Sequence, residues 1–494
     1  MLSVVIFLPL IAALAIAALP ASARVVARWG WIAVTAAELG LTVWLWAGHE
    51  GGGTLAFEER LEWMPTVGSS YHVGLDGLSL PLVALTNIVF FACAIYALRE
   101  RDRPRGQAGL LLALQTTCLG LFAAQDLLVF FVFFDLSIVG MYFVIAGWGH
   151  GNARRAALKF FLYTFLGSLA LLLGFIGLYL AADPHTFDMV ELARADPLAG
   201  RGLAGGLVMA AILLGLAVKT PTVPFHTWLP PAHTDAPAVG SAVLAGVLLK
   251  MGTYGFVRIA MPLLPQAWQA WAWVIVAVGI VSVLYGALVS LAQSDVKRMV
   301  AYTSVNHMGY IVLAVGAAGI LVDSATRARE IAVTGAMVQM VSHGLITAAL
   351  FLLAGLLRDR AGTYEMSRFG GLASTAPRYA GLFAVAAFAS LGIPAFSGFI
   401  AEFQIFTGSI GVTAFAAIAL PGIVLMAAVL LRAVQAILAG PPQGGSVGFA
   451  DVRVHEAVPI GGLLLLSLVI GVVPGPLLAV IEPAAVTVTH LVSR

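Results

Sequence analysis

The sequence is poor in charge and in cysteine. Only 10% of its 494 residues are charged while 61% are hydrophobic, and a typical soluble domain has roughly 25% charged residues. This composition excludes an ordinary soluble protein. The formal net charge of +2 gives no basic surface of the kind that nucleic acid requires, so nucleic acid is excluded as a partner. Cys93 and Cys118, the two cysteines, lie in apolar runs, which excludes a disulfide framework and cysteine-ligated iron–sulfur or zinc sites.

Long apolar segments are abundant instead. A transmembrane helix needs about 20 mostly apolar residues, and the first residues, which lack the basic leader of a signal peptide, are expected to form one too. We predict an all-α polytopic membrane protein with about fourteen transmembrane helices. The predicted spans are 2–20, 28–47, 77–98, 108–124, 127–147, 157–181, 206–220, 238–260, 267–293, 299–320, 330–357, 379–407, 412–438 and 457–480. The longest polar connections, 49–76, 182–205 and 358–378, are too short to fold alone.

The basic residues predict the orientation of these spans. When loops are assigned to alternate faces, one face receives most of the lysines and arginines, and the positive-inside rule makes it cytoplasmic. Both termini are then expected on the outer face. The residues assigned to the cytoplasmic face are Arg24, Arg28, Arg99, Arg101, Arg103, Arg105, Arg154, Arg155, Lys159, Lys297, Arg298, Arg358, Arg360, Arg368, Arg378, Arg432 and Arg453. Arg60, Arg194, Arg201, Arg258, Arg327, Arg329 and Arg494 are assigned to the opposite face.

A few ionisable residues remain inside the predicted spans. A charge at a helix centre costs at least roughly 2.5–3.5 kcal/mol on insertion scales, so an isolated charge without a task or a partner is improbable. Lys250 is the most informative of them, because it lies near the middle of its span, too deep to reach water along its own stem. The set comprises Glu38, Asp135, Lys219, Lys250, Glu402, His307 and His343.

Two apolar runs are interrupted by proline beside such a charge. In KTPTVPFHTWLPPAHTDAP, Pro221 and Pro224 follow Lys219, and in LGIPAFSGFIAEF, Pro394 precedes Glu402. Proline removes a backbone donor, and within lipid such a break is tolerated only where it is buried in protein or lines a wet cavity. One Pro-broken helix in each half of the chain is typical of inverted-repeat transporters that bind ions near the bilayer midplane.

The buried charges can carry protons. Asp135 is the natural partner of Lys219, because a movable carboxylate makes a desolvated lysine a switchable proton carrier. The titratable stations beyond this pair would be Lys250, His226, His307, His343 and Glu402. The alternatives are a structural salt bridge at Lys219, Lys250 or Asp135, and histidines whose hydrogen bonds serve only the packing of the bundle. A packing or interface role is favoured for Glu38.

The residues resemble the antiporter-like subunits of respiratory complex I and the related Mrp cation/proton antiporters. The resemblance covers about residues 75–440 and is strongest in HTWLPPAHTDAP, LLKMGTYG, SDVKRMVAYTSVNHMGY and VSHGLITAALFLLAG. It implies fourteen helices, two inverted five-helix repeats and proton translocation driven by quinone reduction in other subunits. The implied division is 1–105 for the first three helices, 106–262 and 263–440 for the two repeats, and 441–494 for a single last helix.

The resemblance also assigns roles to individual positions. The acidic residue of the fifth helix falls on Asp135, the lysine of the first broken helix on Lys219 and the central lysine on Lys250. The relay histidines fall on His226, His307 and His343. Glu402 in the second broken helix is typical of the M-type subunit, where many relatives carry lysine, and the sequence ends without the long lateral helix of the L-type. The departure is Asp135, because the family usually has glutamate there.

These features predict the proton-translocating M-type subunit of an NADH:quinone oxidoreductase in a bacterial inner membrane, a translocase subunit with no redox site of its own. FMN, iron–sulfur clusters and quinone are expected in partner chains, which would include two further antiporter-like subunits. The alternatives are a subunit of an Mrp-type antiporter or a membrane-bound hydrogenase, and a non-conducting scaffold. An enzyme with its own active site is disfavoured, because the sequence has no nucleotide-binding glycine loop, and prolines between His226 and His233 make a helical metal-ligand pair improbable.

Overall fold

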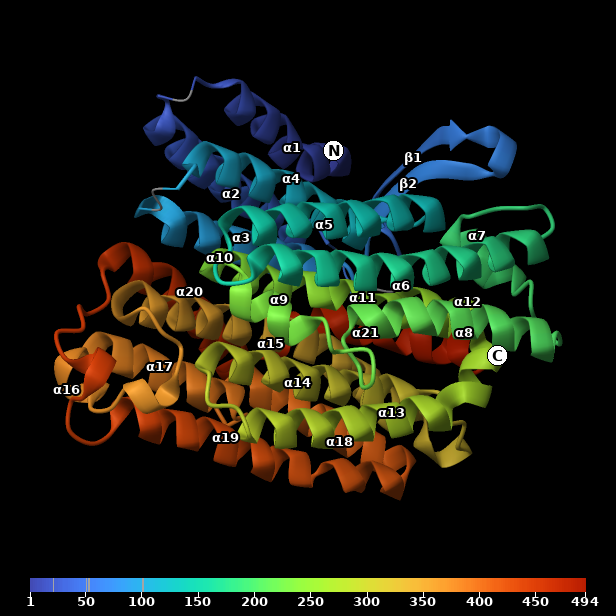
Figure 1. Cartoon of the computed structure of the whole chain (residues 1–494). Helices are drawn as coiled ribbons and strands as arrows, with labels where there is room; N and C mark the ends of the chain where they lie inside the picture. The colour runs from blue at the N-terminus through green and yellow to red at the C-terminus, as the bar shows by residue number, and fades with distance from the viewer. Residues whose placement is uncertain (21, 50, 52–53, 100–101) are drawn as a thin grey trace.

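The computed structural model describes the whole chain except residues 21, 50, 52–53 and 100–101. Long helices lie side by side in one bundle (Figure 1), as predicted for a polytopic membrane protein. The helices are α1 Leu2–Ala18, α2 Arg24–Ala47, α3 Leu80–Tyr96, α4 Pro104–Ala123, α5 Leu127–Trp148, α6 Ala153–Ala181, α7 Met189–Ala195, α8 Gly202–Lys219, α9 Leu229–Asp235, α10 Ala238–Val243, α11 Leu249–Gly255, α12 Met261–Leu263, α13 Pro265–Leu291, α14 Val296–Ala318, α15 Thr326–Ala361, α16 Leu372–Thr375, α17 Pro377–Ser390, α18 Ser397–Val412, α19 Pro421–Leu438, α20 Val454–Val472 and α21 Gly475–Val492.

Eleven helical segments of the described chain are long and apolar enough to cross a membrane, and α1 and α3 are shorter apolar helices. The chain is therefore an integral membrane protein. The predicted total of about fourteen spans and the division into two five-helix repeats stay predictions. Arg101, which contributed to the predicted orientation, lies outside the described residues.

A β-hairpin occupies part of the polar connection for which the sequence predicted no regular structure. Strands β1 (Ala56–Met64) and β2 (Ser69–Leu75) pair in antiparallel fashion, with Arg60 opposite His72. Alternation was hard to read in β1 because its charged residues occupy both faces, with bulges between Ala56 and Glu59 and between Glu62 and Met64. The fold is therefore mainly, not purely, α-helical.

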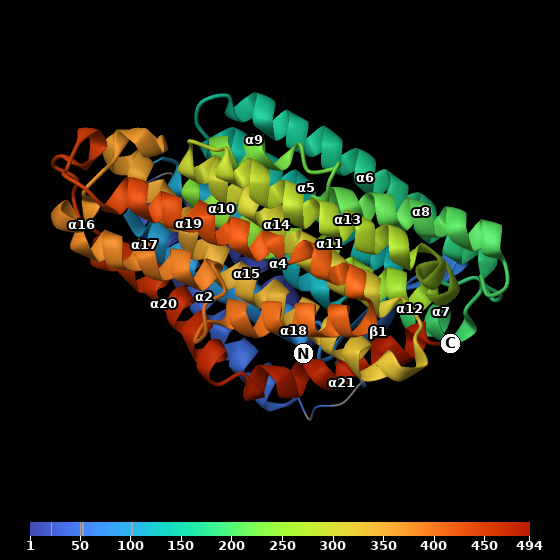
Figure 2. The same ribbon diagram turned by 90° about the horizontal axis from the view of Figure 1, so that it is seen from below.

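The C-terminal segment also differs from the prediction. A single last helix was expected, but α20 and α21 follow one another along the lower edge of Figure 2. Val473 and Pro474 separate them. Proline has no N–H to donate, so it suits the start of a new helix better than the continuation of the previous one.

Three residues that the sequence assigned to loops lie inside the bundle. Lys297 lies in the first turn of α14 and is fully buried, and Arg329 in α15 is 3% exposed. Arg258 belongs to the helical segment 238–263 and forms an ion pair with Asp76. The hydropathy pattern placed them near span ends, where the assignment to a loop or a helix is least certain.

Both termini lie at the same end of the bundle. The amino group of Met1 pairs with Glu59 on β1, and Arg60 on the same strand pairs with a glutamate of α7. The C-terminal Arg494 donates a hydrogen bond to the carbonyl of Ala193 in α7, 3.4 Å away. The hairpin, α7 and the two termini thus form one surface, called the hairpin end below.

Glycines bring α13 and α14 into close contact. A Cβ atom at Gly279 would lie 2.5 Å from the backbone nitrogen of Leu313, and one at Gly309 would lie 2.7 Å from that of Val283. Small residues let membrane helices approach closely, which strengthens van der Waals packing where lipid provides no hydrophobic drive. This contact fixes α14, which carries His307.

Candidate functional site

The first predicted helix break is present and positions Lys219. Helix α8 ends at Lys219, and α9 begins only at Leu229. The carbonyl groups at the break keep partners: Ala217 accepts from the N–H of Thr222 at 3.1 Å, and Val218 accepts from the indole of Trp228 at 2.9 Å. The break is therefore stable within the protein, and Lys219 at the end of α8 is buried, with 1% of its surface exposed.

The predicted pair of Asp135 and Lys219 is not closed in this structure. No nitrogen–oxygen contact within 4.0 Å joins these two described residues. Instead, Lys219 Nζ donates to Ser137 Oγ at 3.0 Å and lies 4.6 Å from the ring centroid of Phe134. Asp135 Oδ1 has no protein partner. Both residues belong to neighbouring elements of the bundle, so the structure shows a separated arrangement of the two charges.

Lys250 lies at the centre of an irregular helix. Two π-helical turns, Leu244–Leu248 and Phe256–Ala260, flank α11, and such turns are frequent at functional sites. The side chain of Lys250 is fully buried, and its Nζ donates to the Ala245 carbonyl at 2.5 Å. The same Nζ lies 2.7 Å from His343 Nδ1. Lys250 and His343, predicted separately, are thus direct neighbours.

The contact with His343 continues into a line of titratable groups. The rings of His343 and His307 are 5.4 Å apart between centroids. His307 Nε2 lies 3.9 Å from Glu402 Oε1 on the far side. All four residues are buried, with at most 8% of their surface exposed. Helices α11, α15, α14 and α18 therefore contribute one residue each to a continuous buried array, called the central line below.

The second broken helix ends the central line at Glu402. Helix α17 ends at Ser390 and α18 begins at Ser397, with Pro394 between them. Gly392 in the break has a φ of +71°, and a Cβ there would lie 2.7 Å from the Glu402 carboxyl group. Only glycine meets both requirements without strain. The glycine in the break thus leaves room for the carboxyl group of Glu402.

Residues of this part of the central line border a small cavity. Its polar walls include atoms without a protein hydrogen-bond partner: His307 Nδ1, His343 Nε2, Gln339 Oε1 and Ser390 Oγ. Buried polar atoms are nearly always hydrogen-bonded, either to protein or to water. The cavity is therefore suited to water and to proton exchange rather than to tight packing.

His226, predicted as a relay residue, is not joined to the other stations by any contact of the described residues. Its ring packs against Tyr285 and Tyr302, with centroid distances of 5.1 and 6.1 Å. The structure therefore supports the order Lys250, His343, His307 and Glu402, and leaves His226 in the first broken helix, apart from them.

Sequence reasoning did not count two buried basic side chains, those of His233 and Lys297, among the candidate stations. His233 is fully buried, neither ring nitrogen has a partner, and its ring stacks on Phe351 with centroids 4.4 Å apart. Lys297 Nζ donates to the Ala236 carbonyl at 2.5 Å and lies 3.4 Å from the Tyr364 hydroxyl. Both residues lie in motifs that carry the family resemblance, HTWLPPAHTDAP and SDVKRM. Only the fold reveals that both side chains are buried.

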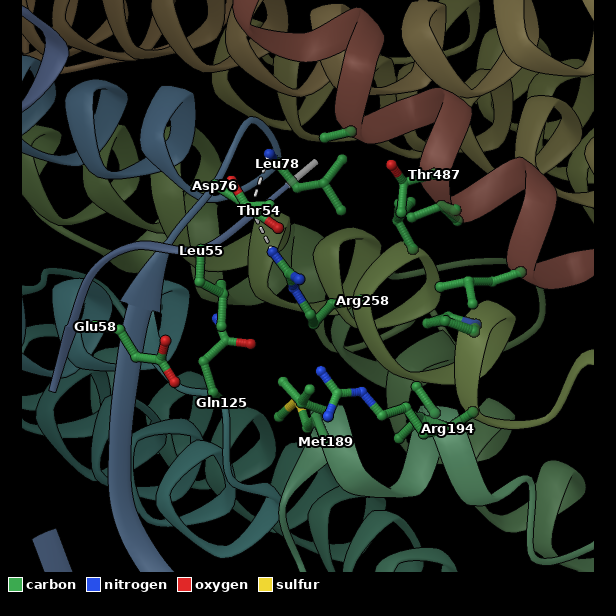
Figure 3. Close-up of a pocket in the computed structure, with 18 of the residues that line it drawn as sticks. Thr54, Leu55, Glu58, Asp76, Leu78, Gln125, Met189, Arg194, Arg258 and Thr487 are labelled. Atoms are coloured by element: carbon green, nitrogen blue, oxygen red, sulfur yellow. Dashed lines mark hydrogen bonds and ion pairs between the residues drawn. The ribbon is translucent and has the colours of Figure 1, made fainter. Parts of the chain in front are cut away.

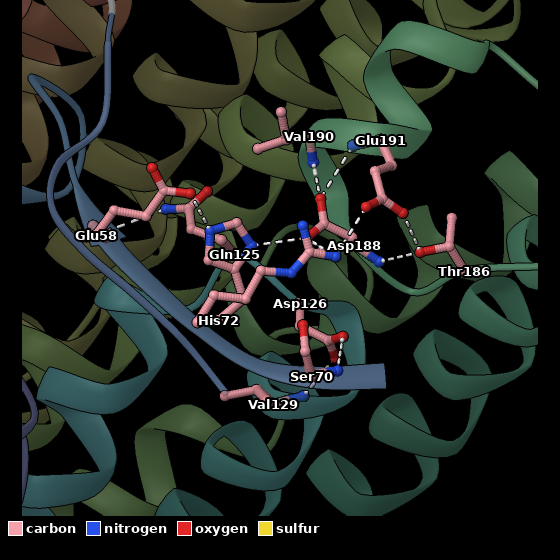
Figure 4. A network of polar contacts seen from close by, with 12 residues as sticks. Glu58, Ser70, His72, Gln125, Asp126, Val129, Thr186, Asp188, Val190 and Glu191 are labelled. Atoms are coloured by element: carbon pink, nitrogen blue, oxygen red, sulfur yellow. Dashed lines mark hydrogen bonds and ion pairs between the residues drawn. The ribbon is translucent and has the colours of Figure 1, made fainter. Parts of the chain in front are cut away.

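A histidine clasp ties the hairpin to α7 outside the membrane spans (Figure 4). His72 Nδ1 lies 2.7 Å from Asp188 Oδ2, and His72 Nε2 lies 2.8 Å from Glu58 Oε1. Asp188 also caps α7 by accepting from the N–H groups of Val190 and Glu191. Burial alone would lower the pKa of His72, but the two carboxylates raise it above its ordinary value. Burial would raise the pKa of Asp188, but His72 and the helix N–H groups lower it.

We expect the clasp to weaken as the pH rises. A raised pKa of His72 in the folded state stabilises the clasp fully below about pH 6.5, and this stabilisation is lost as the pH rises through the raised value. The Asp188 contribution persists there, because its lowered pKa matters only in acid. Hydrogen exchange in β2 and α7, corrected for the intrinsic rate, should give a smaller opening free energy at about pH 9 than at about pH 6. Asp188→Asn keeps the helix cap and should reduce this difference, because Glu58 alone then pairs with His72; an unchanged pH dependence in that variant would refute the explanation.

A cavity of about 510 Å³ opens beside the clasp at the hairpin end (Figure 3). Arg258 closes its inner wall by an ion pair with Asp76, with Nη2 and Oδ1 2.5 Å apart, and donates to the Tyr254 hydroxyl at 2.8 Å. Burial would raise the pKa of Asp76, but Arg258 lowers it below its ordinary value. Arg258 follows Lys250 in the same helical segment, Ala238–Leu263, so one helix carries a wall residue of the cavity and the first residue of the central line.

The chain is similar to known proteins in both sequence and structure. Residues 124–430 match the family described as NADH:quinone oxidoreductase/Mrp antiporter, transmembrane. NADH-quinone oxidoreductase subunit M of Rickettsia prowazekii is 39% identical over 433 residues, which cover 86% of this chain and 85% of that protein. A chain of respiratory complex I from Thermus thermophilus superimposes with a TM-score of 0.89 at 30% identity, over the full length of both chains.

A chain of the Mrp complex from Dietzia superimposes with a TM-score of 0.85 at 23% identity, covering 99% of this chain and 98% of that one. This likeness concerns the fold alone. The match to the family extends over more than half of the chain and includes α5 to α18, which contain both broken helices and the central line. The chain therefore belongs to the NADH:quinone oxidoreductase/Mrp antiporter transmembrane family.

Proposed function

We propose that this chain is the M-type, proton-translocating membrane subunit of an NADH:quinone oxidoreductase. One observation carries the proposal: Lys250, His343, His307 and Glu402 form a buried line of titratable groups that ends in a broken helix. A scaffold has no reason to bear the cost of burying these groups. The test is the number of protons taken up per electron by inverted membrane vesicles when Lys250 has been removed.

The geometry supports a stepwise transfer. Lys250 Nζ and His343 Nδ1 lie within hydrogen-bond distance, 2.7 Å apart, so the lysine can pass a proton to the histidine when its charge is no longer favoured. The gaps from His343 to His307 and from His307 to Glu402 exceed a direct hydrogen bond. A side-chain movement or a bridging water molecule completes each of these two steps. Glu402 then receives the proton next to the second helix break.

The protonation of Lys219, at the end of α8, is controlled by the position of Asp135. With Asp135 close, the ammonium form is favoured, and with Asp135 apart, Lys219 is favoured to release its proton. The structure holds the separated arrangement, with Lys219 on Ser137. His226, Lys297 and His233 are candidates for further stations between this region and the ends of the bundle.

The redox chemistry belongs to partner chains. FMN and iron–sulfur clusters would pass electrons from NADH to quinone there, and two further antiporter-like subunits would accompany this one in the membrane. Subunits of an Mrp-type antiporter or of a membrane-bound hydrogenase use the same module and are the alternative. Purification through a tag on this chain distinguishes them, since copurifying flavin and iron–sulfur chains support the oxidoreductase, whereas small membrane chains alone support the antiporter.

We propose a bacterial inner-membrane location with the hairpin end outside. Arg155 and Arg194 are both exposed and lie on opposite predicted faces, and both native cysteines are buried. Arg194→Cys should therefore react with an impermeant thiol reagent in intact cells, whereas Arg155→Cys should react only in inverted vesicles. The reverse labelling pattern would invert the orientation.

A further inference from the structure

Glu38 is a buried acid that the central line does not use. It lies in the middle of α2, its side chain is 0% exposed, and it faces the contact of α2 with α3 and α4. The neighbouring turns of α2 carry large apolar side chains that are exposed at the surface of the chain, such as Val43 and Trp44. A carboxyl group at this depth is as costly as the charges of the central line and needs its own explanation.

The polar contacts of Glu38 lead away from the membrane-facing surface and into the bundle. Its Oε2 accepts from Asn87 Nδ2 of α3 at 3.4 Å, and Asn87 Nδ2 also donates to Thr42 Oγ1 at 2.8 Å. Gln115 Nε2 of α4 in turn donates to Asn87 Oδ1 at 2.7 Å. Three helices thus share one polar cluster, formed by Glu38, Thr42, Asn87 and Gln115.

The polar cluster offers hydrogen bonds to the Glu38 carboxyl group but no cation to balance its charge. No cation lies within 4.0 Å of Glu38 among the described residues, and Glu38 Oε1, Gln115 Oε1 and Thr116 Oγ1 lack protein partners. An uncompensated carboxylate in such surroundings costs several kcal/mol, so the neutral, protonated form is the one that this site accommodates. A glutamine would accept the same hydrogen bond from Asn87, so a purely structural role does not require an acid here.

We propose that Glu38 is an additional proton-binding site of this subunit, which binds and releases a proton within the polar cluster of α2, α3 and α4. On release, the carboxyl O–H bond breaks and the proton passes to a water molecule, which forms the new O–H bond. No electrons move, and no further reactant is needed. The inference rests on the proposed function of the chain as a proton translocator.

The test uses the intact complex in inverted vesicles. Dicyclohexylcarbodiimide, which modifies protonated carboxyl groups in apolar surroundings, should label Glu38, and the labelling rate should differ between resting membranes and membranes oxidising NADH. Peptide mass mapping separates this adduct from those at Glu402 and Asp135. Glu38→Gln should preserve assembly and lower proton uptake per electron by roughly a third, because one of several proton-binding groups is lost.

Two control variants, one expected to have no effect and one expected to have a strong effect, make the result decisive. Thr35→Ala removes a buried hydroxyl of α2 that bonds only to its own helix, to the carbonyls of Trp31 and Ile32, and should leave the ratio unchanged. Lys250→Ala should lower the ratio strongly. If Lys250→Ala lowers it and Glu38→Gln does not, the inference about Glu38 is wrong while the proposed function stands. If neither variant changes the ratio, the proposed function itself fails.

Discussion

Lys250→Ala is expected to leave the complex assembled while lowering proton uptake per electron roughly twofold or more. The substitution removes a charge whose burial costs insertion energy, so the helix should insert at least as readily as before. It also removes the Nζ atom that lies 2.7 Å from His343 Nδ1. The central line then begins at a histidine whose Nδ1 has lost its partner. Since partner subunits also translocate protons under the proposed function, the ratio falls without reaching zero.

The measurement is the initial rate of NADH-driven proton uptake by inverted vesicles, divided by the rate of quinone reduction in the same preparation. Thr303→Ala is a matched control, because Thr303 is buried in α14 and its hydroxyl bonds only to the carbonyl of Val300 in its own helix. Normal coupling in Lys250→Ala, with normal amounts of complex, would remove Lys250 from the pathway and with it the central line.

The individual charges of the central line were predictable, but their contacts were not. Lys250 and Glu402 stand out in apolar runs, and the cost of burying a charge in the membrane is enough to indicate that both residues have a function. Lys250 and His343 are 93 residues apart, and no periodicity in the sequence specifies which faces of two helices meet. The cost of burying ionisable groups in the membrane was enough to group these residues as stations of one proposed pathway, and the resemblance to known relatives assigned their individual roles.

The errors have the same physical origin. Lys297 stands beside Arg298 in a polar stretch and was assigned to a loop, yet the fold buries it against Ala236 and Tyr364. Strand β1 is rich in Glu and Arg, so it resembles a polar connection rather than an alternating strand. In both cases tertiary contacts decide the outcome where the local sequence signal is weak.

Asp135→Asn is expected to lower proton uptake per electron by an amount similar to Lys250→Ala. The amide cannot supply the negative charge that favours the Lys219 ammonium when the two residues approach. Asp135→Glu restores the charge and adds one methylene of reach, so it should retain most of the coupling. This rescue is informative because Asp135 is only partly buried and its Oδ1 lacks a protein partner, so a longer side chain has room. Loss of coupling in both variants, with full assembly, would indicate a packing role for Asp135.

The double variant Asp135→Asn with Lys219→Met tests whether the two charges act as one unit. In this structure they are separated, with Lys219 on Ser137, so static contacts alone predict independent effects that add. A pair that closes during each cycle predicts instead that the double variant is no worse than either single one, because the first substitution already abolishes the joint step. The readout is again proton uptake per electron, with Lys219→Met alone as the second arm of the cycle. Additive losses would show that Asp135 and Lys219 never meet, and the separated arrangement would then be the permanent one.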